Sequence, residues 1–266
     1  MSEHEGMRVI GIDPASGKGL DRYERGTHWG QRIRPGDARA WVRSQLSADA
    51  PPLFTWDAPI SFDAKFGLTE RPLEASDSPM QKWLARQCAD GKLAHRAVFV
   101  GGFAGLSHWA ISCECLGMPF GDTPDGLRIA GTVEQMRSSS GGQGFVIEVH
   151  PAVSMAVWWV ALDCRGPFPR YKGNSGKGAA QHNRDAQRII WDELGTRGLV
   201  EEGTPVPASD DQLDAWVSWR MGVDFLVGKA CWVGNPSVGG FVLPLAAEER
   251  FGLRTAMEKY MMGRPG

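Results

Sequence analysis

Three acidic residues occupy positions from which a folded chain could bring carboxylates together. Asp13 ends the apolar run RVIGID, and Asp57 ends the apolar run LFTWD. Asp214 lies far downstream, among the apolar residues of the segment SDDQLDAW. Carboxylates collected at one spot repel one another unless a cation lies among them. The types and positions of these residues therefore predict a divalent-cation site.

The segment SDDQLDAW has the signature of a helix N-terminus. Ser209 is a favourable N-cap, and Gln212 follows three residues later, as in a capping box. This spacing places Asp211 and Asp214 on one helix face. Acidic residues in a first turn also favour the helix dipole, and that alternative remains open for Asp210. The helix dipole is a weaker explanation for Asp214, because this residue lies on the second turn.

The two upstream acids also have a second explanation. Asp13 directly precedes Pro14, and Asp57 precedes Ala58-Pro59. Asp near proline is common where a turn begins. The ends of strands in an α/β sheet are, however, where ligand sites gather. Two strand-terminal acids together with an acidic helix start favour the site.

A further acid, Glu148, lies inside the strand-like run FVIEVHP. Alternation along a strand puts Val146, Glu148 and His150 on one face. That face is either a polar surface exposed to water or the site-facing end of a strand. For His150 we expect a structural role, with proton transfer as the alternative.

A basic, glycine-rich stretch follows at residues 165–178. It contains no acid and carries two aromatic residues, Phe168 and Tyr171, beside four cations: Arg165, Arg170, Lys172 and Lys177. Cations beside an aromatic ring suit a phosphate backbone and a stacked base. A solvated loop is the alternative. The run GNSGKG is not a P-loop, because the two glycines before its lysine are too close together. In addition, Gly178 stands after the lysine, where a P-loop requires Ser or Thr.

The elements that must position these residues alternate between strands and helices. A strand at 8–13 precedes two hairpin strands within 14–34, and further strands are predicted at 53–57, 145–149 and 241–243. Helices are predicted from Pro35 and over 78–89, 106–116, 124–137, 151–162, 179–194 and 209–228. This order predicts a single α/β domain over 1–266, with a mixed sheet, flanking helices and a helical insertion at about 61–142.

The net charge, the cysteines and the distribution of apolar residues limit the functions and locations that we expect for this protein. The net charge of −2 means that any contact with nucleic acid must come from a local basic patch. Five cysteines without a C-x-x-C pair argue against a disulfide framework and a zinc ribbon. The sequence shows neither an apolar leader nor an apolar run of membrane-spanning length, so we expect a cytoplasmic protein without membrane contact.

Four short motifs carry a family resemblance: GID at Asp13, WDAPIS at Asp57, EVHP at Glu148 and DDQLDAW at the late helix. Their order resembles a family of predicted nucleases of RNase H-like fold, catalogued as a domain of unknown function. The D-x-x-D-A spacing at Asp211 and Asp214 is also similar to the last motif of Holliday-junction resolvases. The resemblance runs from about residue 7 to residue 228.

This resemblance implies a mixed five-stranded sheet whose first three strands are antiparallel. It also implies a nuclease that hydrolyses DNA or RNA at an acidic site binding Mg²⁺ or Mn²⁺. Carried over by position, the metal ligands would be Asp13, Asp57, Asp211 and Asp214, and Asp13 would bridge two ions. Glu148 would be a further catalytic carboxylate.

Two other functions remain open. An actin-like ATPase or phosphotransferase shares the opening strand and hairpin, and Gly17 and Gly19 could serve its first phosphate loop. The second half of the sequence has no matching strand-Asp-Gly loop. A non-catalytic binding protein could also keep this fold and some of its acids, and an absent Mn²⁺-induced melting shift would favour it.

Overall fold

In the part of the chain that the structure describes, the strands form a six-stranded sheet and a two-stranded hairpin. The structure is a computed structural model that describes residues 7–15, 18–47, 52–60, 71–73, 75–95, 103–116, 127–138, 144–173, 176, 178–236 and 239–263. Lys177, one of the predicted phosphate ligands, lies outside the described residues.

The large sheet combines an antiparallel half and a parallel half. Its strands lie in the order β3 (His28–Trp29), β2 (Gly19–Glu24), β1 (Val9–Ala15), β4 (Leu53–Trp56), β6 (Gly144–Glu148) and β5 (Leu127–Ile129). The first three strands in the chain pair antiparallel, whereas β4, β6 and β5 run parallel to β1. The mixed α/β sheet and its antiparallel opening are therefore confirmed.

The expectation of five strands was wrong, because β5 adds a sixth at the edge beyond β6. The segment 124–137 was predicted to be helical, but its described part contains this strand and the short helix α4 (Val133–Ser138). Only three residues of β5 pair, with Leu127 buried and Arg128 exposed. Such a short strand repeats the two-residue alternation too few times for a sequence pattern to reveal it.

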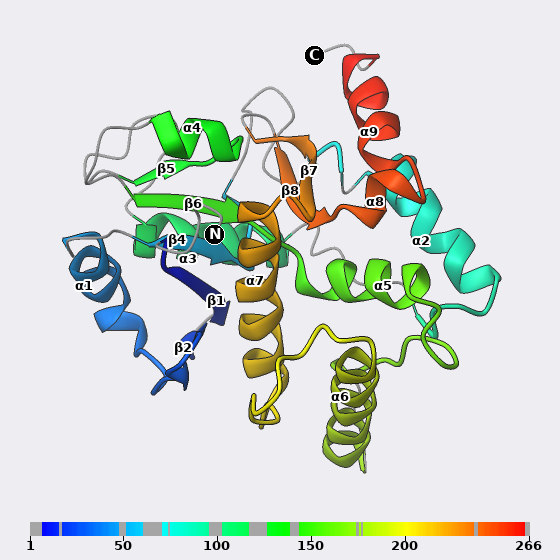
Figure 1. Ribbon diagram of the computed structural model, residues 1–266, viewed down its shortest axis with the longest axis horizontal. Coiled ribbons are helices and arrows are strands. Elements are labelled where there is room, and N and C mark those ends of the chain that lie inside the picture. The colour runs from blue at the N-terminus through cyan, green and yellow to red at the C-terminus, as the bar shows by residue number, and fades with distance from the viewer. Residues whose placement is uncertain are drawn as a thin grey trace.

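Each face of the large sheet is covered by helices. Alternate residues of β1 and β4 enter different cores: Val9 and Leu53 pack on one side, and Ile10 and Phe54 pack on the other. The first side is covered by α7 (Asp210–Leu226), against which α5 (Pro151–Ala161) packs, and the second by α1 (Pro35–Leu46) and α3 (Phe103–Leu116). Figure 1 shows α7 crossing close to β1 and the inner strands.

The C-terminal part builds a second, smaller unit beside α5. Strands β7 (Ala230–Asn235) and β8 (Gly239–Pro244) form an antiparallel hairpin, followed by α8 (Ala246–Glu249) and α9 (Leu253–Met262) (Figure 1). The predicted strand at 241–243 is β8, but its partner β7 was missed. The helices predicted over 78–89 and 179–194 are confirmed as α2 (Pro79–Ala89) and α6 (Ala179–Thr196). Within the described ranges, no helix is both long and apolar enough to cross a membrane.

Candidate metal centre

Asp13 and Asp57 lie at corresponding positions on adjacent parallel strands. Ile12 of β1 is in register with Trp56, the last residue of β4, and each acid is the next residue along the chain. The Asp57 backbone nitrogen donates a 3.0 Å hydrogen bond to the Ile12 carbonyl oxygen, which extends the pairing to the acids themselves. Parallel strands present their carboxyl ends at one edge of the sheet, so both side chains reach the same place.

Asp214 reaches this edge from the start of α7. Ser209 caps the helix by accepting a 3.1 Å hydrogen bond from the Gln212 nitrogen. Gln212 in turn accepts from the backbone nitrogen of Ala208, so the predicted capping signature is confirmed with a slightly shifted second bond. Leu213 and Trp216 are buried and hold the helix against its neighbours, which leaves Asp214 only 1% exposed.

The three acids form one cluster. Each of Asp13, Asp57 and Asp214 offers a carboxylate oxygen that lies within 4.8 Å of the oxygens of the other two. Asp13 and Asp214 are buried, and Asp57 is half-buried. Hard divalent cations such as Mg²⁺ and Mn²⁺ prefer an all-oxygen ligand set of this kind. The residues present therefore fit the predicted cation.

In the absence of a divalent cation, the three carboxyl groups have raised pKa values. Burial, together with the charges of Asp57 and Asp214, raises the pKa of Asp13 well above its usual value. Burial also raises the pKa of Asp57 to about 8, against the opposing effect of Lys172 and with the help of Asp214. For Asp214, burial raises the pKa while Lys172 and Tyr171 oppose the rise. Carboxylates in this state favour protonation or a bound cation over free ionisation.

Two consecutive residues of the loop between α5 and α6 contact Asp214. The Tyr171 hydroxyl donates a 2.7 Å hydrogen bond to Asp214 Oδ1, and Lys172 Nζ lies 2.6 Å from Asp214 Oδ2. Sequence reasoning assigned Lys172 to substrate phosphate and left Tyr171 as a surface for base stacking. The structure places both residues against Asp214 of the acid cluster, and Lys172 also lines the adjoining cleft. The residues around Lys172 in the sequence do not indicate that it contacts Asp214, which lies 42 residues further along the chain.

Glu148 lies at the end of β6, near the cluster but already paired. Its Oε1 is 2.6 Å from Arg71 Nη1, and its Oε2 accepts a 2.9 Å hydrogen bond from the Ile60 nitrogen. Both side chains of this ion pair are almost completely buried. Arg71 was not recognised from the sequence, because it belongs to the long segment between β4 and β5 that lacks a clear pattern.

Asp211 also lines the cleft, one turn before Asp214, but it faces cations. Arg32 Nη2 lies 2.7 Å from Asp211 Oδ2, and Lys18 Nζ lies 3.6 Å from the same oxygen. Arg32 also pairs with Asp21 of β2 at 2.5 Å and so links β2 to α7. Asp211 is therefore adjacent to the three-acid cluster without belonging to it.

Asp13 and Asp57 line a cleft of about 480 Å³ at the carboxyl edge of the sheet, whereas the buried Asp214 is not part of its described lining. Arg170 lines this cleft, and it also binds the loop backbone by donating to the carbonyl oxygens of Lys172 and Gly173. Arg165 lies outside the described lining, where its backbone nitrogen donates to Glu193. The lysine and arginine side chains of the described lining are Lys18, Arg71, Arg170 and Lys172, and two histidines, His108 and His150, also line the cleft.

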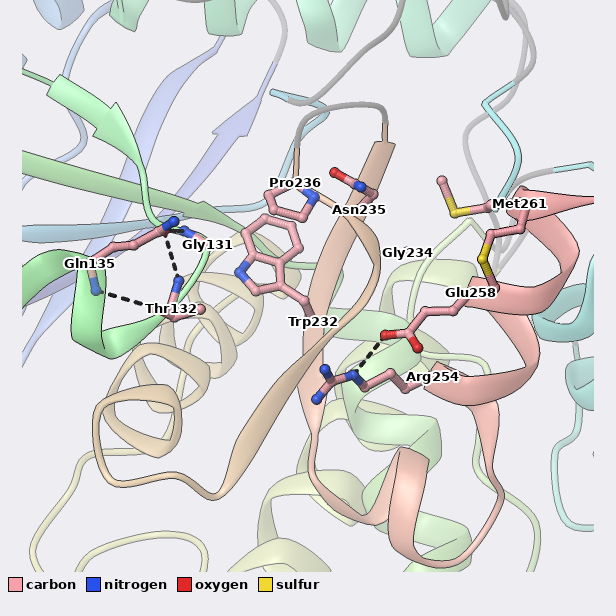
Figure 2. A pocket seen from close by; sticks show the side chains of 11 residues that line it. Gly131, Thr132, Gln135, Trp232, Gly234, Asn235, Pro236, Arg254, Glu258 and Met261 are labelled. Atoms are coloured by element: carbon pink, nitrogen blue, oxygen red, sulfur yellow. Dashed lines mark hydrogen bonds and ion pairs between the residues drawn. The ribbon is translucent and has the colours of Figure 1, made fainter. Parts of the chain in front are cut away.

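A second hollow, of about 630 Å³, lies between the β7–β8 hairpin and α9. Figure 2 shows Trp232 at its centre and the ion pair of Arg254 with Glu258 at its wall. The Trp232 indole nitrogen donates to the Ala130 carbonyl oxygen, and the ion pair closes at 3.0 Å. The opposite charges of Arg254 and Glu258 neutralise each other. The acid-lined cleft is therefore the stronger candidate for a catalytic site.

Comparisons with protein-family models, with curated proteins and with solved structures found no match for this chain. The chemistry of the cleft therefore carries the functional interpretation.

Proposed function

We propose that this protein is a metal-dependent nuclease of RNase H-like fold, which hydrolyses the phosphodiester bonds of DNA or RNA. A mixed sheet whose first three strands are antiparallel is what the family resemblance implies, and the pairing of β1, β2 and β3 supports the proposal. Strand β5 and the β7–β8 hairpin are additions to that arrangement. Fold alone does not determine a reaction, so the proposal depends on the site.

The observation that carries the proposal is the convergence of three acids from distant segments. Asp13, Asp57 and Asp214 place carboxylate oxygens within 4.8 Å of one another, and two of them, Asp13 and Asp57, line the adjoining cleft. These residues would hold one Mg²⁺ or Mn²⁺ ion. A second ion of a two-metal site would draw on Glu148 or Asp211, each of which now pairs with an arginine.

The surroundings of the acids suit a phosphodiester. Lys18, Arg170 and Lys172 line the same cleft and can neutralise the phosphates on either side of the scissile bond. A divalent ion supplies stabilisation of charge on the phosphate and activates water for attack. Asp13 and Asp214, being buried, hold their oxygens in fixed positions and exclude bulk water from that point.

The proposal is tested by incubating the full chain with Mn²⁺ or Mg²⁺ and end-labelled nucleic acids. The substrates are single-stranded and duplex DNA, RNA, an RNA–DNA hybrid and a four-way junction. We expect cleavage of at least one substrate, loss of cleavage with EDTA, and a decrease of about 100-fold or more in Asp13→Asn and Asp214→Asn. Asp192→Asn, an exposed change on α6, is the matched control and should retain full activity.

Two results would contradict the proposal. One is cleavage that persists unchanged in Asp13→Asn, because the activity would then come from elsewhere. The other is Mg²⁺-dependent hydrolysis of ATP without cleavage of any nucleic acid, which would favour the actin-like alternative. Circular dichroism of each variant separates loss of activity from loss of fold.

A further inference from the structure

Lys172 supplies a positive charge at the place where the proposed cation would bind. Its ammonium nitrogen lies 2.6 Å from Asp214 Oδ2, while the Tyr171 hydroxyl occupies Oδ1 of the same carboxylate at 2.7 Å. Both oxygens of Asp214 are thus engaged by neighbours from one loop. Asp214 is also one of the three acids whose oxygens lie within 4.8 Å of one another.

The loop anchors Tyr171 more firmly than Lys172. Tyr171 is 1% exposed, and its carbonyl oxygen accepts a 3.2 Å hydrogen bond from Gln187 of α6. Its ring packs edge-on against Phe168, whose backbone bonds to residues 92 and 94. The Lys172 side chain, by contrast, is 42% exposed and opens onto the cleft. Its flexible stem can therefore leave Asp214 while the backbone stays in place.

A single ammonium group is a poor counter-ion for three acids. It carries one positive charge and directs its hydrogen bonds at Asp214, whereas a divalent ion can bind oxygens of all three carboxylates at once. Tyr171 and Lys172 already engage the two oxygens of Asp214, so an ion that binds Asp214 through Oδ2 would have to displace the ammonium. The displaced ammonium would remain in the cleft, within reach of a bound phosphate.

We propose that Lys172 is a built-in competitor of the divalent ion: it neutralises the acid cluster in the metal-free protein and is displaced into the cleft when the ion binds. This inference rests on the proposed function and adds a regulatory step to it. Lys172 thereby sets the metal affinity of the site and reaches the substrate phosphate only after the ion is bound.

The first test compares Mn²⁺ affinity, measured by calorimetry and electron paramagnetic resonance, among the wild type, Lys172→Met and Lys18→Met. Lys18 is the matched control, because it lines the same cleft but pairs with Asp211 outside the cluster. We expect Lys172→Met to bind Mn²⁺ about tenfold more tightly than the wild type, equivalent to about 1.4 kcal/mol. Lys18→Met should change the affinity less than about twofold, because its charge lies outside the cluster.

The affinities separate failure of the competitor from failure of the metal site. Equal Mn²⁺ affinity of the wild type and Lys172→Met would refute the role of Lys172 as a competitor. The same conclusion would follow if Lys18→Met increased the Mn²⁺ affinity as much as Lys172→Met. In both cases Mn²⁺ still binds, so the proposed metal site would stand. If none of the three proteins binds Mn²⁺, the metal site and the competitor fall together.

A second measurement uses the unmodified protein and so does not depend on the folding of a variant. Lysines are labelled by reductive methylation with formaldehyde and dimethylamine-borane, with and without saturating Mg²⁺, and quantified by mass spectrometry. We expect Mg²⁺ to increase the labelling rate of Lys172 several-fold while leaving Lys92, which lies outside the described lining of the cleft, unchanged. A Lys172 rate that Mg²⁺ leaves equal or lowers would overturn the proposal.

Discussion

Gly11 of β1 lies directly beneath Ala215 of α7. A Cβ atom added at Gly11 would stand 2.1 Å from the Ala215 carbonyl oxygen and 2.3 Å from the Trp219 backbone nitrogen. Both are backbone atoms of the helix, which cannot rotate aside as a side chain could. Gly11 precedes Asp13 by two residues, and Ala215 follows Asp214 directly. The absence of a side chain at Gly11 therefore lets these two acids come together.

The change Gly11→Ala tests this relationship. The added methyl group must push α7 away from β1, and overpacking of this kind lowers the free energy of unfolding by about 1–3 kcal/mol. We also expect weaker Mn²⁺ binding, because Asp214 moves with the helix. Gly36→Ala in α1 is the matched control: its Cβ would meet nothing within 4 Å, so its stability should stay equal or rise. Urea denaturation and calorimetry measure both effects.

Asp13→Asn separates stability from metal binding. The substitution removes one of three neighbouring charges with little change of shape, so the metal-free protein should become more stable. A gain of about 1 kcal/mol would raise Tm by roughly 2–4 °C. The same variant should lose the Mn²⁺-induced rise in Tm. A lower Tm without metal, together with an intact Mn²⁺ shift, would show that Asp13 is not a ligand.

The stability of the metal-free protein should fall as pH rises from about 4 to about 8. The pKa of Asp57 is about 8 in the folded protein, and an unfolded aspartate has a pKa of about 3.9. Between these values the folded state retains a proton that the unfolded state has released, so each increase in pH favours unfolding. Thermal melting at pH 6 and pH 8.5 measures the effect.

Asp57→Asn is the control for this pH dependence, because its amide cannot titrate. The variant should lose less stability than the wild type between the two pH values. Saturating Mn²⁺ should also diminish the wild-type decrease, since binding holds the carboxylates ionised. Equal pH dependence in wild type and Asp57→Asn would refute the assignment of this proton to Asp57.

The buried ion pair of Arg71 and Glu148 should behave as a structural unit. Arg71→Met leaves Glu148 buried without its cation, which is expected to lower the free energy of unfolding by about 3–5 kcal/mol. The double variant Arg71→Met with Glu148→Gln should recover most of this loss, because no unpaired charge remains. Chemical denaturation of the two variants provides the comparison, and a double variant as unstable as the single one would contradict it.

The sequence predicted local features of the site better than its long-range partners. Asp13 and Asp57 were recognised because each ends an apolar run shortly before a proline, and Asp214 because a capping serine fixes the helix that carries it. The strand end expected at Asp13 was wrong, because β1 continues through Pro14 to Ala15 and pairs there with β2. The register of Ile12 with Trp56 then brings the acids together. The signals that marked the three acids each lie within a few residues along the chain, whereas the register that joins them became known only from the structure.

The missed features depend on contacts between distant segments. Lys172 was expected at a phosphate because its own neighbours are basic, and nothing near this loop residue indicates its ion pair with Asp214 of α7. Arg71 pairs with Glu148 across 77 residues, and nothing near Arg71 indicates it. Strand β7 was missed because its residues ACWVGN pair with β8 in a small hairpin, where burial from both sides removes the alternation of polar and apolar residues.

The location of a bound ion tests the central claim most directly. Crystals soaked in Mn²⁺ and measured at the manganese absorption edge should show an anomalous peak among Asp13, Asp57 and Asp214, at about 2.0–2.6 Å from their carboxylate oxygens. The Lys172 ammonium should have moved away from Asp214 in the same crystals. An acid cluster that stays without a peak at saturating Mn²⁺, with Lys172 still on Asp214, would contradict the account.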